Sequence, residues 1–177
     1  MAVKLTDATD FKIFLKLNLN NLKGAFSMSL NFDKYTKKAN EIVNELSLEL
    51  GNVSDSDKAG RVLRSVLHAL RNILSTEESV QLLSQLPMYI KAVYVDGWKI
   101  NKKHVRIRHL EDFLEEVCTE NEKNNFRDFP NESSVYNAVL AVFNVLRNHV
   151  SAGEIDDIKS NMPKELKHLW EDEKVNI

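Results

Sequence analysis

Four basic side chains recur at spacings of three, four and three residues on one predicted helix: Arg61, Arg64, His68 and Arg71. Residues three or four apart lie on the same side of an α-helix, so these side chains share one face. A basic segment, Lys99 to His109, comes later in the chain and adds more cations. The ones that we expect to face the helix are Lys102, Lys103, Arg106 and Arg108. Together these residues predict a surface that could bind phosphate, RNA or an acidic protein.

The basic face also has a simpler interpretation, in which it is solvated and pairs with an acidic second half of the chain. No aromatic residues alternate with the basic ones, which weakens the case for stacking single-stranded bases. Seventy-six residues further on, the corresponding positions hold Asn137, Leu140, Asn144 and Arg147, so the fold does not require the stripe. Trp98 is a further candidate, either as a seal between helices or as an exposed anchor for a partner.

Other patterns of chemistry are weak in this sequence. The five histidines include no pair four residues apart and no HExxH motif, so we expect no metal site. Cys118 falls on the apolar face of a predicted helix, where a small core residue is the favoured interpretation. Phosphate-binding glycine motifs and the GxSxG nucleophile motif do not occur. We therefore expect no catalytic residue and no cofactor.

Charge is distributed unevenly along the chain, although the net charge is only −2. Residues 1–109 hold 17 Lys and Arg against 11 Asp and Glu, whereas residues 110–177 hold 7 against 15. Opposite halves could attract each other or a second copy of the chain, so a homo-oligomer is one hypothesis. A single cysteine excludes an intramolecular disulfide, which fits a cytoplasmic protein. No apolar run approaches the roughly 20 residues that span a bilayer.

The chain contains an internal repeat. Ala59 to Tyr94 aligns without gaps with Val135 to Trp170, and Leu70-Arg71-Asn72 falls on Leu146-Arg147-Asn148. Each copy contains a Ser-x-x-Glu capping box that starts a short helix. A proline then ends that helix and starts another, because proline has no backbone N–H to donate inside a helix.

These signals predict an all-α fold of two quasi-equivalent repeats, each with about four helices in the order helix, helix, short helix, proline, short helix. We expect the repeats to pack as a pair of helical bundles. The predicted organisation is an extension over 1–28, a first repeat over 29–98, a basic linker over 99–109, a second repeat over 110–171 and an acidic tail over 172–177. The extension either packs as an added helix or does not belong to the native protein.

Two further predictions concern local features of the chain. Arg71 and Arg147 lie near the end of the long central helix of each copy, where an arginine can bind backbone carbonyls or a carboxylate of a following short helix. The polar segment 119–134 should be a loop that is anchored in the core by Phe126, Phe129 and Pro130.

Several stretches resemble the bacterial domain-of-unknown-function family 2267. They are Gln85-Leu86-Pro87, Tyr94-Val95-Asp96-Gly97-Trp98, Arg106-Ile107-Arg108 and Pro163 to Trp170. The resemblance covers roughly residues 29–171. It implies a bacterial, cytosolic, all-α protein with a twofold repeat, and it implies no catalytic residue or cofactor.

Our leading hypothesis is a non-enzymatic module for protein interaction or regulation, with an unknown protein as its partner. Two alternatives remain open. One is an anion or nucleic-acid binder that uses the basic face of the first repeat, and the other is a small-molecule binder or enzyme with a pocket between helices.

Overall fold

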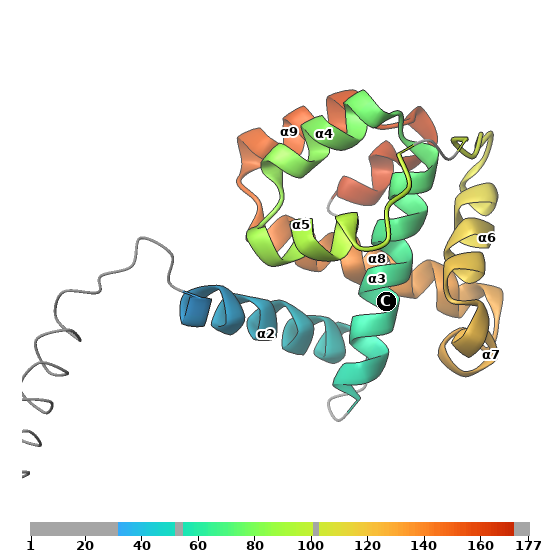
Figure 1. The fold of residues 1–177 in the computed structure, drawn as a ribbon. Helices are drawn as coiled ribbons and strands as arrows, with labels where there is room; N and C mark the ends of the chain where they lie inside the picture. The colour runs from blue at the N-terminus through green and yellow to red at the C-terminus, as the bar shows by residue number, and fades with distance from the viewer. Residues whose placement is uncertain (1–31, 52–54, 101–102, 172–177) are drawn as a thin grey trace, which may run out of the picture. The chain divides into compact units, whose positions relative to one another are not determined.

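The computed structural model describes residues 32–51, 55–100 and 103–171, and these residues form helices without any strand. The predicted all-α class is confirmed. Tyr35–Ile177 forms one compact unit, and the packing below is that of its described residues. Figure 1 shows α2 (Phe32–Glu49), α3 (Ser56–Ile73), α4 (Thr76–Gln85), α5 (Met88–Val95), α6 (Leu110–Glu120), α7 (Asn125–Asp128), α8 (Glu132–His149) and α9 (Ala152–Asn161). Two 3₁₀ helices complete the set, η1 (Glu122–Asn124) and η2 (Lys164–Trp170).

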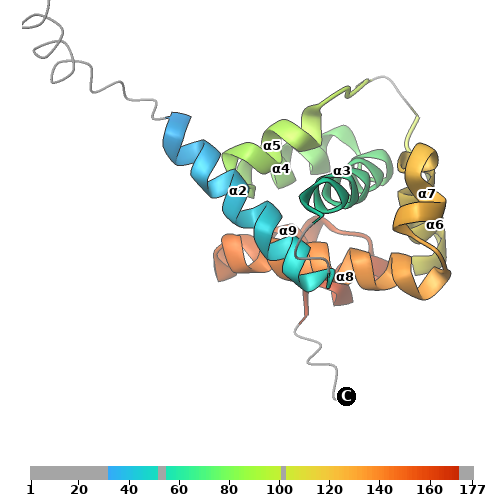
Figure 2. The same cartoon turned by 90° about the horizontal axis from the view of Figure 1, so that it is seen from below.

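Helix α3 lies at the centre of the compact unit. Asp55 starts it by accepting a hydrogen bond from the backbone N–H of Lys58 at 2.8 Å. Apolar residues cover more than one side of the helix, as expected for a segment that packs against several neighbours. The structure places α5, α6 and α8 around it, and Figure 2 shows α3 nearly end-on among them. Twelve of its residues are buried, including His68 and Arg71.

Both predicted capping boxes are present. The Ser75 hydroxyl accepts from the Glu78 backbone N–H at 3.2 Å, and the Glu78 carboxylate accepts from the Ser75 N–H at 2.7 Å. Ser151 and Glu154 make the same reciprocal pair at the start of α9. The breaks at the two prolines are also as predicted, because α4 ends before Pro87 and α9 ends before Pro163.

One apolar core unites the two halves of the chain, and it draws side chains from every long helix. The halves meet along α4 and α9, along α3 and α6, and along α3 and α8. The bounds of α3 and α4, shifted by 76 residues, are those of α8 and α9. The equivalence of two separate bundles in three dimensions stays a prediction, since the buried residues form a single cluster.

Helix α5 is fixed to the rest of the fold through Tyr94. Its ring is fully buried, and its hydroxyl donates to the Ser79 Oγ at 2.9 Å. Burial raises the pKa of Tyr94 to about 12, so the phenol stays neutral at physiological pH. The chain then turns through Gly97, whose φ of 65° is easily adopted only by glycine.

The segment after α6 differs from its prediction as a loop with three anchors. It forms η1 and α7, and only Phe129 of the three predicted anchors is buried. Phe126 is 94% exposed and Pro130 is exposed, so both were wrongly assigned to the core. The four-residue helix α7 turns Phe126 outward and uses Phe129 at its end to close the core.

The capping box of α4 should contribute measurably to stability. Ser75→Ala removes the hydroxyl that accepts the Glu78 N–H, so the free energy of unfolding should fall by about 1 kcal/mol. Urea unfolding followed by circular dichroism would measure this. Ser84→Ala is the matched control, because Ser84 is exposed on the same helix and should change stability by less than about 0.5 kcal/mol. Equal effects of the two substitutions would contradict the assignment.

Candidate functional site

A polar pocket of about 290 Å³ opens beside the second half of α3. Its walls come from α3, from the turn after α5, from the following linker and from α6. The residues that line it are Arg64, His68, Arg71, Asn72, Asp96, Gly97, Trp98, Lys99, Lys103, His104 and Glu120. With both histidines neutral, these residues have a formal charge of +2, so the pocket is basic. We call it the basic pocket.

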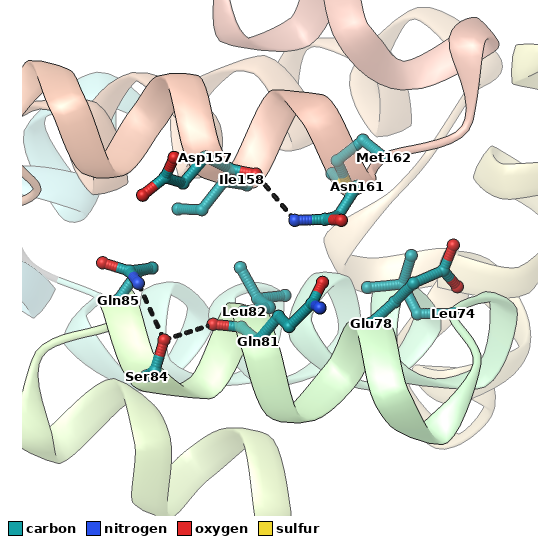
Figure 3. A pocket seen from close by; sticks show the side chains of 10 residues that line it. All are labelled: Leu74, Glu78, Gln81, Leu82, Ser84, Gln85, Asp157, Ile158, Asn161 and Met162. Carbon is teal, nitrogen blue, oxygen red and sulfur yellow. Dashed lines mark hydrogen bonds between the residues drawn. The ribbon is translucent and has the colours of Figure 1, made fainter.

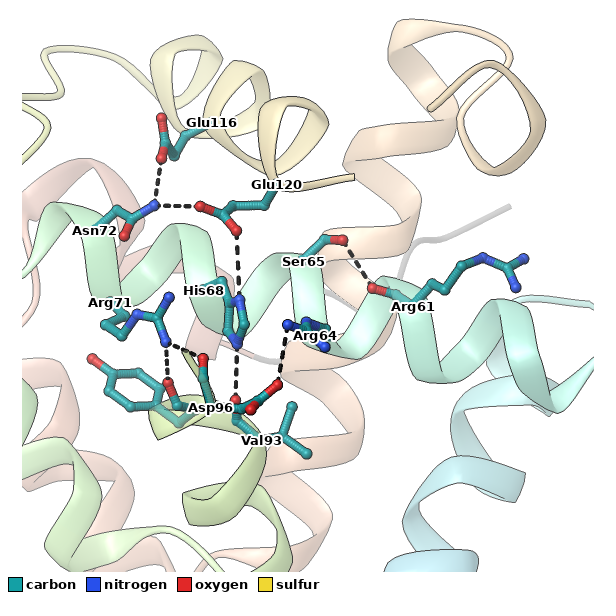
Figure 4. A network of polar contacts seen from close by, with 11 residues as sticks. Arg61, Arg64, Ser65, His68, Arg71, Asn72, Val93, Asp96, Glu116 and Glu120 are labelled. Carbon is teal, nitrogen blue, oxygen red and sulfur yellow. Dashed lines mark hydrogen bonds and ion pairs between the residues drawn. The ribbon is translucent and has the colours of Figure 1, made fainter. Parts of the chain in front are cut away.

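Arg71 lies at the base of this pocket and is only 7% exposed. Its Nη1 donates to the backbone carbonyls of Tyr94 and Asp96, at 2.8 and 2.9 Å (Figure 4). Arg71 therefore bonds to carbonyls as predicted, but they lie at the end of α5 and not in α4, the short helix that directly follows α3. Burial lowers the pKa of the guanidinium from its ordinary value, while Glu120 acts in the opposite direction. The side chain remains a cation, because that ordinary value is above 12.

The remaining nitrogens of Arg71 have no hydrogen-bond partner among the described residues. Nε is buried and unpaired, and no hydrogen bond joins Nη2 to a described residue. The two carbonyls that Nη1 binds are neutral. Consequently this buried guanidinium does not bond directly to a carboxylate, and its charge is only partly compensated.

His68 lies one turn before Arg71 and is 3% exposed. Its Nε2 is 2.9 Å from the Val93 carbonyl, and its Nδ1 is 3.4 Å from a carboxylate oxygen of Glu120. Since a carbonyl oxygen can only accept, we place a proton on Nε2. Asn72 donates to both Glu116 and Glu120, at 2.6 and 2.7 Å. These bonds hold α6 against α3 and form one wall of the basic pocket.

The rim of the pocket is more exposed than its base. Arg64 pairs with Asp96 at 3.0 Å, and more than half of each side chain is exposed, so this ion pair contributes little to stability. Lys99, Lys103 and His104 are exposed. Among the described residues, neither lysine has an ion-pair partner. The rim therefore holds two cations that are free to meet a ligand.

A backbone hydrogen bond brings the linker to the pocket. The Val105 N–H donates to the Asn72 carbonyl at 2.8 Å, near the C-terminal end of α3. That bond satisfies a carbonyl at the helix end, which has no partner inside the helix. It also positions the preceding Lys103 and His104 beside the turn that contains Trp98. The Trp98 ring is partly buried and meets the Tyr94 ring edge-to-face, with centroids 6.0 Å apart.

The structure brings together five of the predicted site residues: Arg64, His68, Arg71, Trp98 and Lys103. Arg61 does not line the basic pocket, although it lines two neighbouring pockets together with Arg64. Arg106 and Arg108 are exposed and do not line the basic pocket, and Lys102 lies outside the described residues. Sequence reasoning missed Lys99, His104, Asp96 and Glu120 as wall residues. Glu116 and Glu120 are four residues apart, and this spacing was the one available signal that they share a face towards α3.

Arg61 forms an ion pair with the buried Asp128 instead, and its own side chain is partly exposed. Its Nε and Nη2 bind the two carboxylate oxygens of Asp128 at 2.8 and 2.9 Å, and Asn121 donates to the same carboxylate at 3.2 Å. Burial would raise the pKa of Asp128, but the bonds from Arg61 and Asn121 outweigh it and the pKa is lowered. The hydrogen bond to Asp128 raises the pKa of Arg61. This bidentate pair ties α3 to the end of α7.

A second pocket, of about 210 Å³, lies between α4 and α9. Figure 3 shows its apolar floor, which includes Leu82 and Ile158, and its rim of amides and carboxylates. Two side-chain amides on the rim already donate hydrogen bonds to nearby residues of their own helices. Gln85 donates to the Ser84 hydroxyl, and Asn161 donates to the Asp157 carbonyl. Nothing in this lining converges on one ligand group.

Catalytic and metal chemistry have little support in the described part of the chain. None of the described residues that line the basic pocket is Ser, Thr or Cys. Burial raises the pKa of the Cys118 thiol, which disfavours the reactive thiolate. Among residues 32–51, 55–100 and 103–171, no three His, Cys, Asp or Glu side chains are placed to hold a metal ion. In the same ranges, no helix is both long and apolar enough to cross a membrane.

A sequence model of the family described as Uncharacterized conserved protein (DUF2267) matches residues 39–169. This match spans most of the chain and includes every residue that lines the basic pocket. No curated protein matches the sequence.

Asp128 should make stability depend on pH. At neutral pH, Asp128→Asn should lower the free energy of unfolding by about 1.5–3 kcal/mol, because it removes charged hydrogen bonds to Arg61. The lowered pKa of Asp128 means that its contribution is complete above the unfolded pKa, about 3.9. It is lost as the pH falls through the folded-state value, so wild type and variant should converge in acid.

Urea unfolding at a series of pH values would measure this convergence. Asp156→Asn is the matched control, because Asp156 is an exposed aspartate on α9, and its substitution should change stability by less than about 0.5 kcal/mol. A constant gap between wild type and Asp128→Asn down to pH 2 would show that the ionised carboxylate is not the cause.

Proposed function

We propose that this chain, which belongs to the uncharacterised conserved family DUF2267, is a non-enzymatic interaction module that holds a protein partner by an anionic group seated in the basic pocket. The family membership predicted from the sequence is confirmed, and the family itself has no assigned function. The proposal therefore depends on the pocket. We further propose that the module works in a bacterial cytoplasm, since its single cysteine cannot form an intramolecular disulfide.

The observation that supports this function most strongly is the incompletely paired charge of Arg71. A buried cation is costly unless it is paired, and the bonds of Arg71 to two neutral carbonyls offset only part of that cost. An anion in the pocket would supply the missing counter-charge. Lys99 and Lys103 on the rim would attract such a group before it reaches the base.

A nucleic acid fits the same residues less well. Binding to a phosphate backbone needs a row of free cations spaced along a surface. On α3 that row is interrupted, because Arg61 is bound to Asp128 and Arg64 to Asp96. The cations of the basic pocket, Arg71, Lys99 and Lys103, lie around one opening, which favours a single anionic group over a polymer.

The other hypotheses also lose support. The opposite charges of the two halves are used inside the chain, where α3 bonds to Asp128 and Glu120, so they provide little for a second copy. At about 290 Å³ the basic pocket is slightly smaller than the roughly 300–1,000 Å³ of most small-molecule sites. It suits one group that projects from a larger partner. An enzyme would need a nucleophile or an available acid–base pair in the pocket. The described lining has no hydroxyl or thiol. Its His68–Glu120 pair is bonded to the Val93 carbonyl and to Asn72, and His68 is only 3% exposed.

The test compares capture of a partner by wild type and by a pocket variant. The full chain would be used as bait in a lysate of its source cells, at low and high salt, with and without nuclease. Lys99→Gln/Lys103→Gln removes both rim cations, and these exposed residues should be replaceable without unfolding the chain. We expect a stoichiometric protein that wild type retains after nuclease treatment and that the variant loses.

Lys37→Gln/Lys164→Gln is the matched control, because it removes the same charge from two exposed positions that do not line the basic pocket. It should retain the partner. Two outcomes would overturn the proposal. One is a partner that binds the pocket variant as well as wild type, and the other is a capture that disappears with nuclease.

A further inference from the structure

We infer that the group which enters the basic pocket is the phosphoryl group of a phosphorylated side chain. This inference rests on the proposed function, and it adds the chemical class of the ligand. It follows from three properties of the described residues: the surplus charge of the pocket, the bonding state of Arg71 and the directions from which the cations converge.

The surplus charge matches a dianion. Arg64 and Asp96 neutralise each other on the rim. The one other carboxylate of the described lining belongs to Glu120, which is held by Asn72 and lies beside His68. The remaining cations are Arg71, Lys99 and Lys103, and subtracting Glu120 leaves +2. A phosphorylated side chain has a charge of about −1.5 to −2 at pH 7, whereas a carboxylate has −1.

The bonding state of Arg71 disfavours a carboxylate as the ligand. Arginine binds a carboxylate best through two parallel N–H groups that form a fork. In Arg71, Nη1 is occupied by two carbonyls and Nε is buried, so neither can form such a fork with Nη2. Arg71 can therefore offer a charge and the two N–H groups of Nη2 alone. This removes the geometric advantage of a planar ligand.

The directions of the cations suit a tetrahedral ligand. Arg71 reaches the pocket from α3, Lys99 from the turn after α5, and Lys103 from the linker that Val105 ties to α3. Each belongs to a different segment of the chain around the pocket. A phosphoryl group has three acceptor oxygens that point in different directions, so each oxygen can meet a separate cation. The partly exposed Trp98 lies beside the opening, where it would contact the residues that flank the phosphorylated position.

The experiment is an NMR titration of the full ¹⁵N-labelled chain at constant ionic strength. The probes are sodium phosphate, sodium sulfate and sodium acetate. We expect phosphate and sulfate to shift the Trp98 indole and the Lys99 and His104 amide signals, with a Kd at least about tenfold lower than that of acetate, because the charge of the ligand is doubled. Lys99→Gln/Lys103→Gln should raise the phosphate Kd by about tenfold or more, and Lys37→Gln/Lys164→Gln should leave it within about twofold.

A second arm identifies the source of the phosphoryl group. It uses a short peptide with one phosphoserine, the same peptide with serine, and the same peptide with glutamate. Only the phosphoserine form should shift the pocket signals, with a Kd no higher than that of inorganic phosphate. Weaker binding of the phosphopeptide than of inorganic phosphate would overturn this inference in favour of a small phosphate-bearing molecule.

The outcomes separate this inference from the function on which it rests. Acetate binding as tightly as phosphate, with both weakened in the pocket variant, would overturn the phosphoryl assignment and leave the anion-dependent interaction intact. Anions that shift no pocket signal would overturn the phosphoryl assignment. If the variant also still captured the partner, the proposed function would fail with it.

Discussion

The bond between a buried arginine and the end of a short helix organises the site and much of the fold around it. Arg71 projects from α3 and binds the carbonyls of Tyr94 and Asp96, so it satisfies acceptors that α5 leaves unpaired at its C-terminus. Those bonds fix the turn at Gly97, and the turn places Trp98 and Lys99 on the rim. The same guanidinium that holds the fold together therefore shapes the pocket. Its incompletely compensated charge is the feature on which we base the proposal that the pocket binds an anion.

The repeated triplet Leu-Arg-Asn can be explained by the same logic, because each residue has one task in both copies. Leu70 and Leu146 are each 1% exposed in the core. Arg71 bonds the end of α5, and Arg147 bonds the Glu171 carbonyl at the end of η2, at 2.7 Å. The asparagine binds a glutamate of a helix from the other half of the chain, through Asn72 to Glu120 and through Asn148 to Glu45. The triplet thus joins the two halves, because its asparagine bonds the central helix of each half to the first helix of the other.

Local physics explains why much of this could be predicted from the sequence. The length of α3 follows from its apolar periodicity, the starts of α4 and α9 from their capping boxes, and their ends from proline. Gly97 allows the turn after α5, because few other residues adopt a positive φ. Each of these signals acts within a few residues, so the sequence displays it directly. The basic stripe on α3 was found for the same reason.

Pairings between distant segments were not predictable in the same way. The contact of Glu120 with Asn72 was not predicted, since nothing near Glu120 in the sequence shows that α6 turns this side towards α3. Phe126 was assigned to the core by its apolar side chain, but the turn of α7 directs it outward and leaves Phe129 to fill the space. Whether an acidic or aromatic side chain is buried or exposed depends on which residues of other helices pack against it. Tertiary packing determines those neighbours, so the local sequence does not show them.

The two ends of the basic stripe show how one helix can separate a structural role from a binding role. Arg61 and Arg71 are ten residues apart, which places their backbones about 15 Å from each other along α3. One small anion cannot reach both. Asp128 occupies Arg61 through two hydrogen bonds to its carboxylate, and that cation is then unavailable to a ligand. Arg71 meets only neutral carbonyls, because α5 presents its C-terminal end there instead of an acidic side chain. What distinguishes the two arginines is the charge of the partner that the fold supplies, and only the one with a neutral partner retains an attraction for an external anion.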